Sequence, residues 1–231
     1  MSPSANLLQD IQDLVKGRIK VASQLEWSHP GSSRDIPSSV DWRNKGVVPP
    51  VANQGQCGDP ALYAALDSVD AIWAIENGHL VLASREECMD CCLKTGCGGV
   101  LAGSIFECIV RLGGLAKEGE YVSPNHTCLS DKYPPVVKIS GAKLLAPSGD
   151  EQALAVAVAR QPIVVGVDAS HTSFQMYESG IYHDPKCSSE ELDHSMLVVG
   201  YGSQGGQDYW IVKNSWGKSD QGLILHVFLI L

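Results

Sequence analysis

The cysteines are the most prominent chemically reactive residues of this chain, with eight among 231 residues. Six of them fall within one segment: Cys88, Cys91, Cys92, Cys97, Cys108 and Cys128. This density is high for a reduced cytosolic protein and typical of disulfides in an oxidising compartment. The spacings 88–91 and 92–97 partly suit zinc, but two cysteines are adjacent and no second CxxC pair follows. We therefore expect disulfides, no metal site and no cofactor, with zinc as the minor alternative.

A glycosylation sequon, Asn125-His126-Thr127, adds to the evidence for a secretory origin. The N-terminal segment does not support a secretory origin, because residues 1–20 contain no apolar stretch of the signal-peptide type. The formal net charge of −9 disfavours nucleic acid and anionic membranes as partners. No run approaches the ~18 apolar residues of a membrane span. We expect a monomer with neither kind of partner.

The first part of the chain reads as helical. Apolar residues recur at helical spacing over 5–20, and a Pro/Ser/Gly linker follows over 28–39, so the globular part begins near Ile36. Asp59-Pro60 predicts a helix start, since Asp is a favoured N-cap and Pro suits the first helical position. Gly78 predicts its end. A second helix is predicted over 102–112.

From residue 146 the pattern changes to strands. A short helix is predicted over 152–161, and four runs rich in β-branched and aromatic residues follow: 162–169, 195–202, 208–217 and 223–231. Helices first and strands second predict an α+β protein with two lobes. The predicted division is 36–145, mainly helical, and 146–231, mainly β.

Four segments, in order, resemble the papain family of cysteine peptidases, and the cathepsin L-like members in particular. They are "IPSSVDWRNKGVVPPVANQGQCG" (36–58), "CMDCCLKTGCGG" (88–99), "LDHSMLVVGYG" (192–202) and "YWIVKNSWG" (209–217). The resemblance implies a two-lobed papain-like fold with a helical left lobe and an antiparallel, β-barrel-like right lobe. By that pattern the chain stops before the last strand is complete, and residues 1–35 are a propeptide remnant or an unrelated leader.

The family's chemistry uses a cysteine thiolate at a helix N-terminus and a histidine that accepts its proton. An asparagine orients the imidazole, and a glutamine side chain helps to receive the oxyanion. By position, the resemblance implies these roles for His194, Asn214 and Gln54, with Trp216 shielding the His–Asn contact.

The nucleophile position of this pattern is occupied by Pro60. Proline has no nucleophilic atom and no backbone N–H, so a thiolate and an oxyanion donor are lost together. Cys57 falls on the family's structural cysteine, three residues before the helix, and would have to refold the turn to reach His194. We expect an inactive homologue.

Substrate contacts are implied at Gly98 and Gly99, whose backbone would pair with an extended peptide. Leu192 and Ser195 match positions near the pocket for the substrate's second residue, and Trp216 also lies at the substrate site. An apolar preference is expected, with a peptide or protein segment as the partner.

Disulfides Cys57–Cys97 and Cys91–Cys128 are implied by the resemblance. Cys187 would pair near the C-terminus, where the sequence offers no cysteine. Cys88 and Cys92 could pair with each other or stay free, and Cys108 is expected to be a buried thiol.

The expected function is therefore that of a catalytically inactive papain-like homologue that keeps a peptide-binding cleft. Two alternatives are an active endopeptidase that uses Cys57, and a truncated product without function. The resemblance implies a lysosomal or extracellular location.

Overall fold

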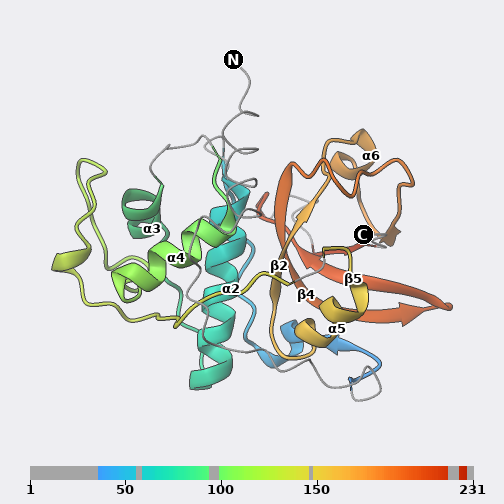
Figure 1. Ribbon diagram of the computed structural model, residues 1–231, viewed down its shortest axis with the longest axis horizontal. Coiled ribbons are helices and arrows are strands. Elements are labelled where there is room, and N and C mark those ends of the chain that lie inside the picture. Colours follow the sequence, from blue (N-terminus) through green and yellow to red (C-terminus); the bar gives the residue numbers. More distant parts are fainter. Residues whose placement is uncertain (1–35, 56–58, 94–98, 146–147, 218–223, 228–231) are drawn as a thin grey trace.

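The computed structural model describes residues 36–55, 59–93, 99–145, 148–217 and 224–227. A helical part and a sheet part lie side by side (Figure 1). The helices are η2 (Trp42–Lys45), α2 (Pro60–Asn77), α3 (Arg85–Cys92), α4 (Ala102–Leu112), η3 (Ser130–Lys132), α5 (Glu151–Val158) and α6 (Thr172–Gln175). The strands are β1 (Val40–Asp41), β2 (Ile163–Val167), β3 (Ile181–Tyr182), β4 (His194–Gln204), β5 (Gln207–Lys213) and β6 (Ile224–Val227). The helix predicted for residues 5–20 lies outside this description.

Helix α2 begins and ends where its capping residues predict. The Asp59 side chain accepts a hydrogen bond from the Leu62 N–H, Pro60 is the first helical residue, and Gly78 has φ 77°. Proline is tolerated there because the first N–H groups of a helix have no intrahelical partner. The helix packs against both α4 and β4, so it is the central contact between the two parts.

The helix predicted for residues 102–112 is confirmed as α4, and the short helix predicted for 152–161 is confirmed as α5. Helix α3 was not predicted from the pattern. It begins at the Ser84 side chain, which accepts from the Glu87 N–H, and it carries Glu86 and Glu87 in its first turn, where negative charge is favourable.

The six-stranded sheet has the order β1-β4-β5-β6-β3, and β2 pairs with β4 on a separate branch. All pairs are antiparallel except β3 with β6, which run parallel. Strand β1 joins this sheet although it precedes every described α-helix. Its close approach needs a glycine, since a Cβ at Gly200 would lie 2.2 Å from the Val40 carbonyl oxygen.

Each part has its own hydrophobic core. One lies among α2, α3 and α4 and includes Leu62, Leu66, Val69, Ile105, Ile109 and Leu115. The other lies against the sheet and includes Leu154, Val158, Phe174, Met196, Val198, Trp210 and Val212. Each such side chain contributes roughly 1.5–3 kcal/mol when fully buried.

A buried ion-pair network joins the two parts. Asp67 of α2 pairs with Lys213 at the end of β5, and both side chains are almost fully buried. Arg85 of α3 donates to the other Asp67 oxygen at 2.9 Å. Because charges removed from water need partners, this network fixes how α2 meets β5.

Two disulfides lie in the described helical part: Cys91–Cys128 and Cys92–Cys108. The prediction of a Cys108 thiol is therefore wrong, because α3 and α4 pack together and bring Cys92 to Cys108. Two cysteines of the zinc alternative are used in these bonds and are not free thiolates. Cys88 stays a buried thiol, and the implied Cys57–Cys97 bond lies outside the described residues.

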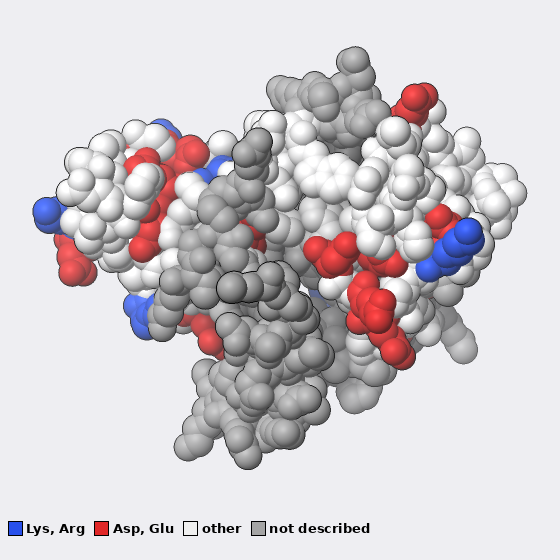
Figure 2. Space-filling model, turned by 90° about the horizontal axis from the view of Figure 1, so that it is seen from above, with Lys and Arg blue, Asp and Glu red and all other residues white. Residues whose placement is uncertain are grey.

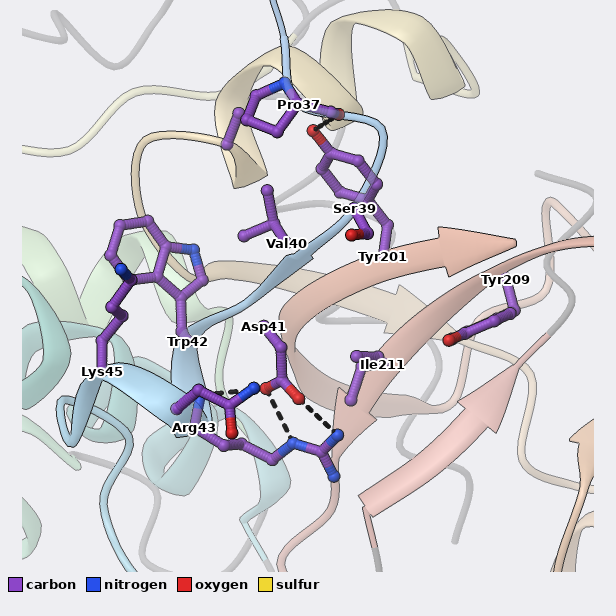
Figure 3. A pocket seen from close by; sticks show the side chains of 12 residues that line it. Pro37, Ser39, Val40, Asp41, Trp42, Arg43, Lys45, Tyr201, Tyr209 and Ile211 are labelled. Atoms are coloured by element: carbon purple, nitrogen blue, oxygen red, sulfur yellow. Dashed lines mark hydrogen bonds and ion pairs between the residues drawn. The ribbon is translucent and has the colours of Figure 1, made fainter. Parts of the chain in front are cut away.

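The face seen in Figure 2 carries several groups of acidic side chains, and a few basic side chains lie beside some of them. A surface pocket of about 590 Å³ lies between η2 and strands β4 and β5 (Figure 3). Arg43 makes a double contact with Asp41 on one side of it, with Nη2–Oδ2 at 2.6 Å. None of the site residues predicted above lines this pocket. No helix within the described ranges has the length and apolar character needed to cross a bilayer.

Candidate active site

His194 and Asn214 meet at adjacent strand ends. His194 is the first residue of β4, and Asn214 directly follows β5, the antiparallel neighbour of β4. The His194 Nε2 lies 2.8 Å from the Asn214 Oδ1, and both side chains are buried. The register of two strands therefore holds the imidazole and the amide together.

The protonation pattern of the His194 ring follows from the partners of Asn214. The Ser215 N–H donates to the Asn214 Oδ1 at 2.8 Å, so the atom of the amide that lies against His194 is its oxygen and not its nitrogen. A carbonyl oxygen can only accept, so the His194 Nε2 carries a hydrogen and donates. In the neutral ring the lone pair then belongs to Nδ1, which is the atom able to act as a base.

The surroundings of His194 favour its neutral form. The Trp216 ring lies 5.1 Å from the imidazole, centroid to centroid, at an interplanar angle of 39°. Burial lowers the pKa of His194 below its ordinary value, and the hydrogen bond to Asn214 and the charge of Asp193 oppose this more weakly.

Gln54 is fixed against the segment that carries Asn214. Its backbone N–H donates to the Ser215 carbonyl at 2.8 Å, and the Ser215 hydroxyl donates to its Oε1 at 2.5 Å. The neighbouring Asn53 forms a β-bridge with Trp216. With its oxygen engaged, the Gln54 amide offers its NH₂ group as a donor, which is the end that an oxyanion requires.

The position that the resemblance implies for the nucleophile lies at the start of α2. Pro60 is the first residue of the helix, and the buried Asp59 precedes it as N-cap. Burial raises the pKa of the Asp59 carboxyl, and its Oδ2 has no hydrogen-bond partner among the residues described. Cys57 lies outside those residues.

Leu192 and Ser195 come together around Gly166. Ser195 pairs with Gly166 in the β2–β4 register, and a Cβ at residue 166 would lie 3.0 Å from the Leu192 Cδ1. Leu192 is 39% exposed. These three residues form a small surface next to His194, with an apolar side chain at Leu192 and little side-chain bulk at the other two positions. Gly99 is described with φ 82°, whereas Gly98 falls outside the described ranges.

Sequence reasoning missed three residues that hold this site. Ser215 links Gln54 to Asn214, Gly166 gives Leu192 its space, and Asp193 anchors the turn before His194 by accepting from the Ala169 N–H at 2.7 Å. Only the strand register could have shown Gly166, whereas Ser215 stands within the quoted "KNSWG" stretch.

Residues 36–223 match the model of the papain family cysteine proteases. The chain belongs to the papain family. This membership and the mixed architecture of helices and a largely antiparallel sheet confirm the α+β papain-like fold.

Relatives of this papain-family chain come from distant organisms. Cysteine proteinase 3 of Dictyostelium discoideum is 42% identical over 189 residues, which are 79% of this chain and 56% of the relative. Cathepsin L2 of Homo sapiens is 43% identical over 196 residues, 79% of this chain and 58% of the relative. The structure of the bromelain protease from Ananas comosus with the E64 inhibitor matches with a TM-score of 0.74 and 35% identity, covering 83% of this chain and 89% of that one. The chain spans little more than half the length of these two curated relatives.

Proposed function

We propose that this papain-family chain is catalytically inactive and binds an extended peptide or protein segment in the cleft beside His194. The observation that carries the proposal is Pro60 at the first position of α2. There the family's chemistry requires a thiol and a backbone N–H, and proline supplies neither. Helix α2 keeps its cap and its packing, so the substitution removes chemistry and leaves the fold.

The magnitudes support inactivity. Loss of one oxyanion donor costs about 2.7–4 kcal/mol of transition-state stabilisation. In a serine protease, which also uses a nucleophile activated by a histidine, removal of the nucleophile lowers kcat by a factor on the order of 10⁶. His194 has lost the thiolate that would hold its proton, and burial keeps its pKa low. The pair of ions on which the reaction depends therefore does not form.

The remaining geometry supports binding. Gln54, His194 and Asn214 keep their hydrogen bonds to each other or to Ser215, so the polar side of the site is preorganised. The Leu192–Ser195–Gly166 surface suits an apolar second residue of the ligand, and Gly99 would offer backbone groups to an extended strand. Disulfides in the described part favour a lysosomal or extracellular location.

Binding is tested with two fluorescent hexapeptides that differ only at the second residue of the recognised segment, Leu in one and Asp in the other. Fluorescence anisotropy gives Kd, and mass spectrometry of the same samples shows whether the peptide is cut. We expect saturable binding of the Leu peptide, at least tenfold weaker binding of the Asp peptide, and no cleavage.

A matched variant locates the binding. Gly166→Val places methyl groups against the Leu192 side chain, so we expect it to raise the Kd of the Leu peptide at least tenfold. The control Gly103→Ala adds a methyl group in open space on α4 and is expected to leave this Kd unchanged. Cleavage by the unaltered chain would refute inactivity. A cooperatively melting chain that binds neither peptide would refute the binding role and favour a product without function.

A further inference from the structure

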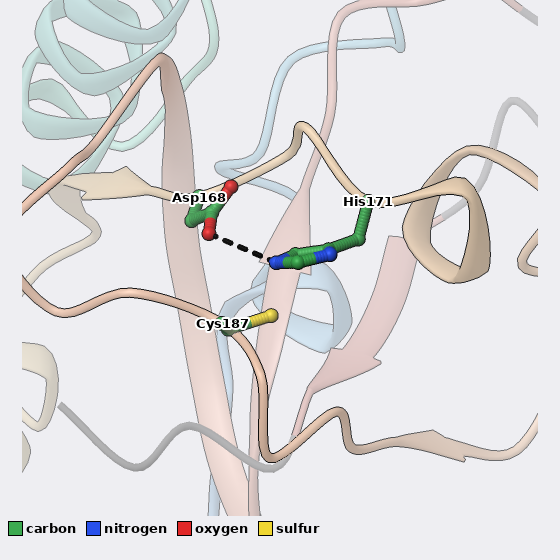
Figure 4. Close-up of side chains that lie close together, drawn as sticks. All are labelled: Asp168, His171 and Cys187. Carbon is green, nitrogen blue, oxygen red and sulfur yellow. Dashed lines mark ion pairs between the residues drawn. The ribbon is translucent and has the colours of Figure 1, made fainter.

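Three metal-ligating side chains converge on the sheet side of the molecule, outside the site described above. Asp168 directly follows β2, His171 is the N-cap of α6, and Cys187 lies between β3 and β4. One ligand atom from each lies within 4.8 Å of the other two, and the three side chains point toward one another (Figure 4). The Asp168 Oδ2 and the His171 Nε2 are 3.2 Å apart.

We propose that Asp168, His171 and Cys187 form a Zn²⁺ site. Zinc bonds of roughly 2.0–2.3 Å in a tetrahedron place neighbouring ligand atoms about 3.3–3.7 Å apart. The carboxylate–imidazole pair, at 3.2 Å, is already close to this separation. The Cys187 sulfur lies within 4.8 Å of both atoms, so it would have to move by at most about 1 Å to join them. A thiolate, an imidazole and a carboxylate select zinc over calcium or magnesium, which prefer oxygen ligands. A water molecule would complete the fourth position.

The surroundings of the cluster resemble the outer ligand shell of a metal site. The Asp168 Oδ1 accepts from the Ser170 hydroxyl at 2.7 Å and from its N–H at 3.0 Å, and the Oδ2 accepts from the Ser188 N–H at 2.9 Å. These bonds, with His171, lower the pKa of Asp168 to about 2, so the carboxyl is ionised. Such partners orient a ligand before the metal arrives.

Cys187 is available as a ligand. It is an unpaired, partly buried thiol in the structure, with its sulfur 3.8 Å from the Tyr182 hydroxyl. Burial raises the pKa of the thiol, so zinc must displace its proton on binding. The three ligands are three and sixteen residues apart in the sequence, a spacing that matches no common zinc-binding motif. The sequence therefore offered no reason to expect a metal at these residues.

The site adjoins the functional strands. Val167, the neighbour of Asp168, pairs with His194 in the β2–β4 register, and Ala169 donates to Asp193. Zinc would tie the loop after β2 to the segment before β4, so the bound metal stabilises the turn that presents His194.

The test uses the full chain, freed of metal, with Co²⁺ as a spectroscopic probe and Zn²⁺ as its competitor. Cobalt in a tetrahedral site with one thiolate gives a sulfur-to-metal charge-transfer band and intense visible bands. We expect one equivalent of cobalt to produce both and one equivalent of zinc to abolish both. We expect each of the variants Cys187→Ser, His171→Ala and Asp168→Asn to lower the affinity for Zn²⁺ at least 100-fold. Ser170→Ala is expected to lower it about 10-fold.

Matched controls separate this site from other ligands. His79→Ala removes an exposed histidine, Cys88→Ala a buried thiol and His194→Ala the base of the candidate active site, and each is expected to leave zinc affinity unchanged. Zinc should also raise the melting temperature of the unaltered chain and not that of His171→Ala. A cobalt spectrum without the thiolate band, unchanged affinity in the three ligand variants, or a Cys187 found oxidised by thiol mapping would overturn the proposal.

Discussion

Asp70 predicts a pH dependence of stability that can be worked out from its surroundings. Its side chain is fully buried in α2, and its Oδ1 accepts from the Ala83 N–H at 2.8 Å. Its Oδ2 has no hydrogen-bond partner in the part of the chain that is described. Burial raises the pKa of Asp70 from 3.8 to about 8, and the bond from Ala83 and the charge of Arg85 oppose this only in part.

The sign of the effect follows from the higher pKa in the folded state. The folded protein holds the Asp70 proton more tightly than the unfolded chain does. The stability that this gives is fully present below the unfolded pKa of 3.8 and is lost as the pH rises through the folded pKa of about 8. Each pKa unit corresponds to about 1.4 kcal/mol, so a rise from 3.8 to about 8 sets an upper limit on this loss of about 6 kcal/mol. Asp70→Asn keeps the oxygen that accepts from Ala83 and cannot ionise, so it should abolish this loss.

The assay is urea unfolding at several pH values from about 4 to 8, for the unaltered chain, Asp70→Asn and the exposed control Asp131→Asn. The free energy of unfolding of Asp70→Asn should exceed that of the unaltered chain by several kcal/mol at the alkaline end and match it within about 1–2 kcal/mol at the acidic end. Titration of His194 affects all three proteins equally and cancels. A constant difference between Asp70→Asn and the unaltered chain over the whole range would refute the reasoning.

Three further substitutions test the packing, each by urea or thermal unfolding. Lys213→Met leaves Asp67 with one cationic partner in place of two and should cost about 3 kcal/mol; adding Asp67→Leu should recover part of it, and no recovery would contradict an ion-pair origin. Gly200→Ala forces a methyl group against a carbonyl oxygen of β1 and should cost about 1–3 kcal/mol, whereas a neutral effect would mean that β1 moves freely. Replacing Cys92 and Cys108 together by alanine opens a crosslink over 16 residues and should cost about 3 kcal/mol, a loss that reduction of the unaltered chain should reproduce or exceed.

The elements that the sequence predicted are those with local signals. Asp59, Pro60 and Gly78 each act on their own turn of α2, so its bounds could be read from neighbouring residues. The strands β2, β4 and β5 carry dense β-branched runs. Helix α3 escaped prediction because its residues are mostly polar or cysteine and show no apolar stripe.

The parts of the site that the sequence could not reveal depend on contacts between distant segments. The roles expected for His194 and Asn214 came from a resemblance, and their 2.8 Å contact depends on the β4–β5 register. The space that Gly166 gives to Leu192 depends on the register between β2 and β4. The Cys92–Cys108 bond depends on how α3 meets α4, which cysteine spacing does not encode.

The claim that residue 60 has removed the reaction is tested most directly with a peptidyl epoxide that alkylates activated thiols. Intact-mass analysis and peptide mapping would be applied to the unaltered chain, to Pro60→Cys, and to Pro60→Cys combined with His194→Ala. We predict no adduct at the candidate active site of the unaltered chain, one adduct at position 60 of Pro60→Cys, and its loss when His194 is also replaced. An adduct on Cys57 of the unaltered chain that depends on His194 would contradict the account.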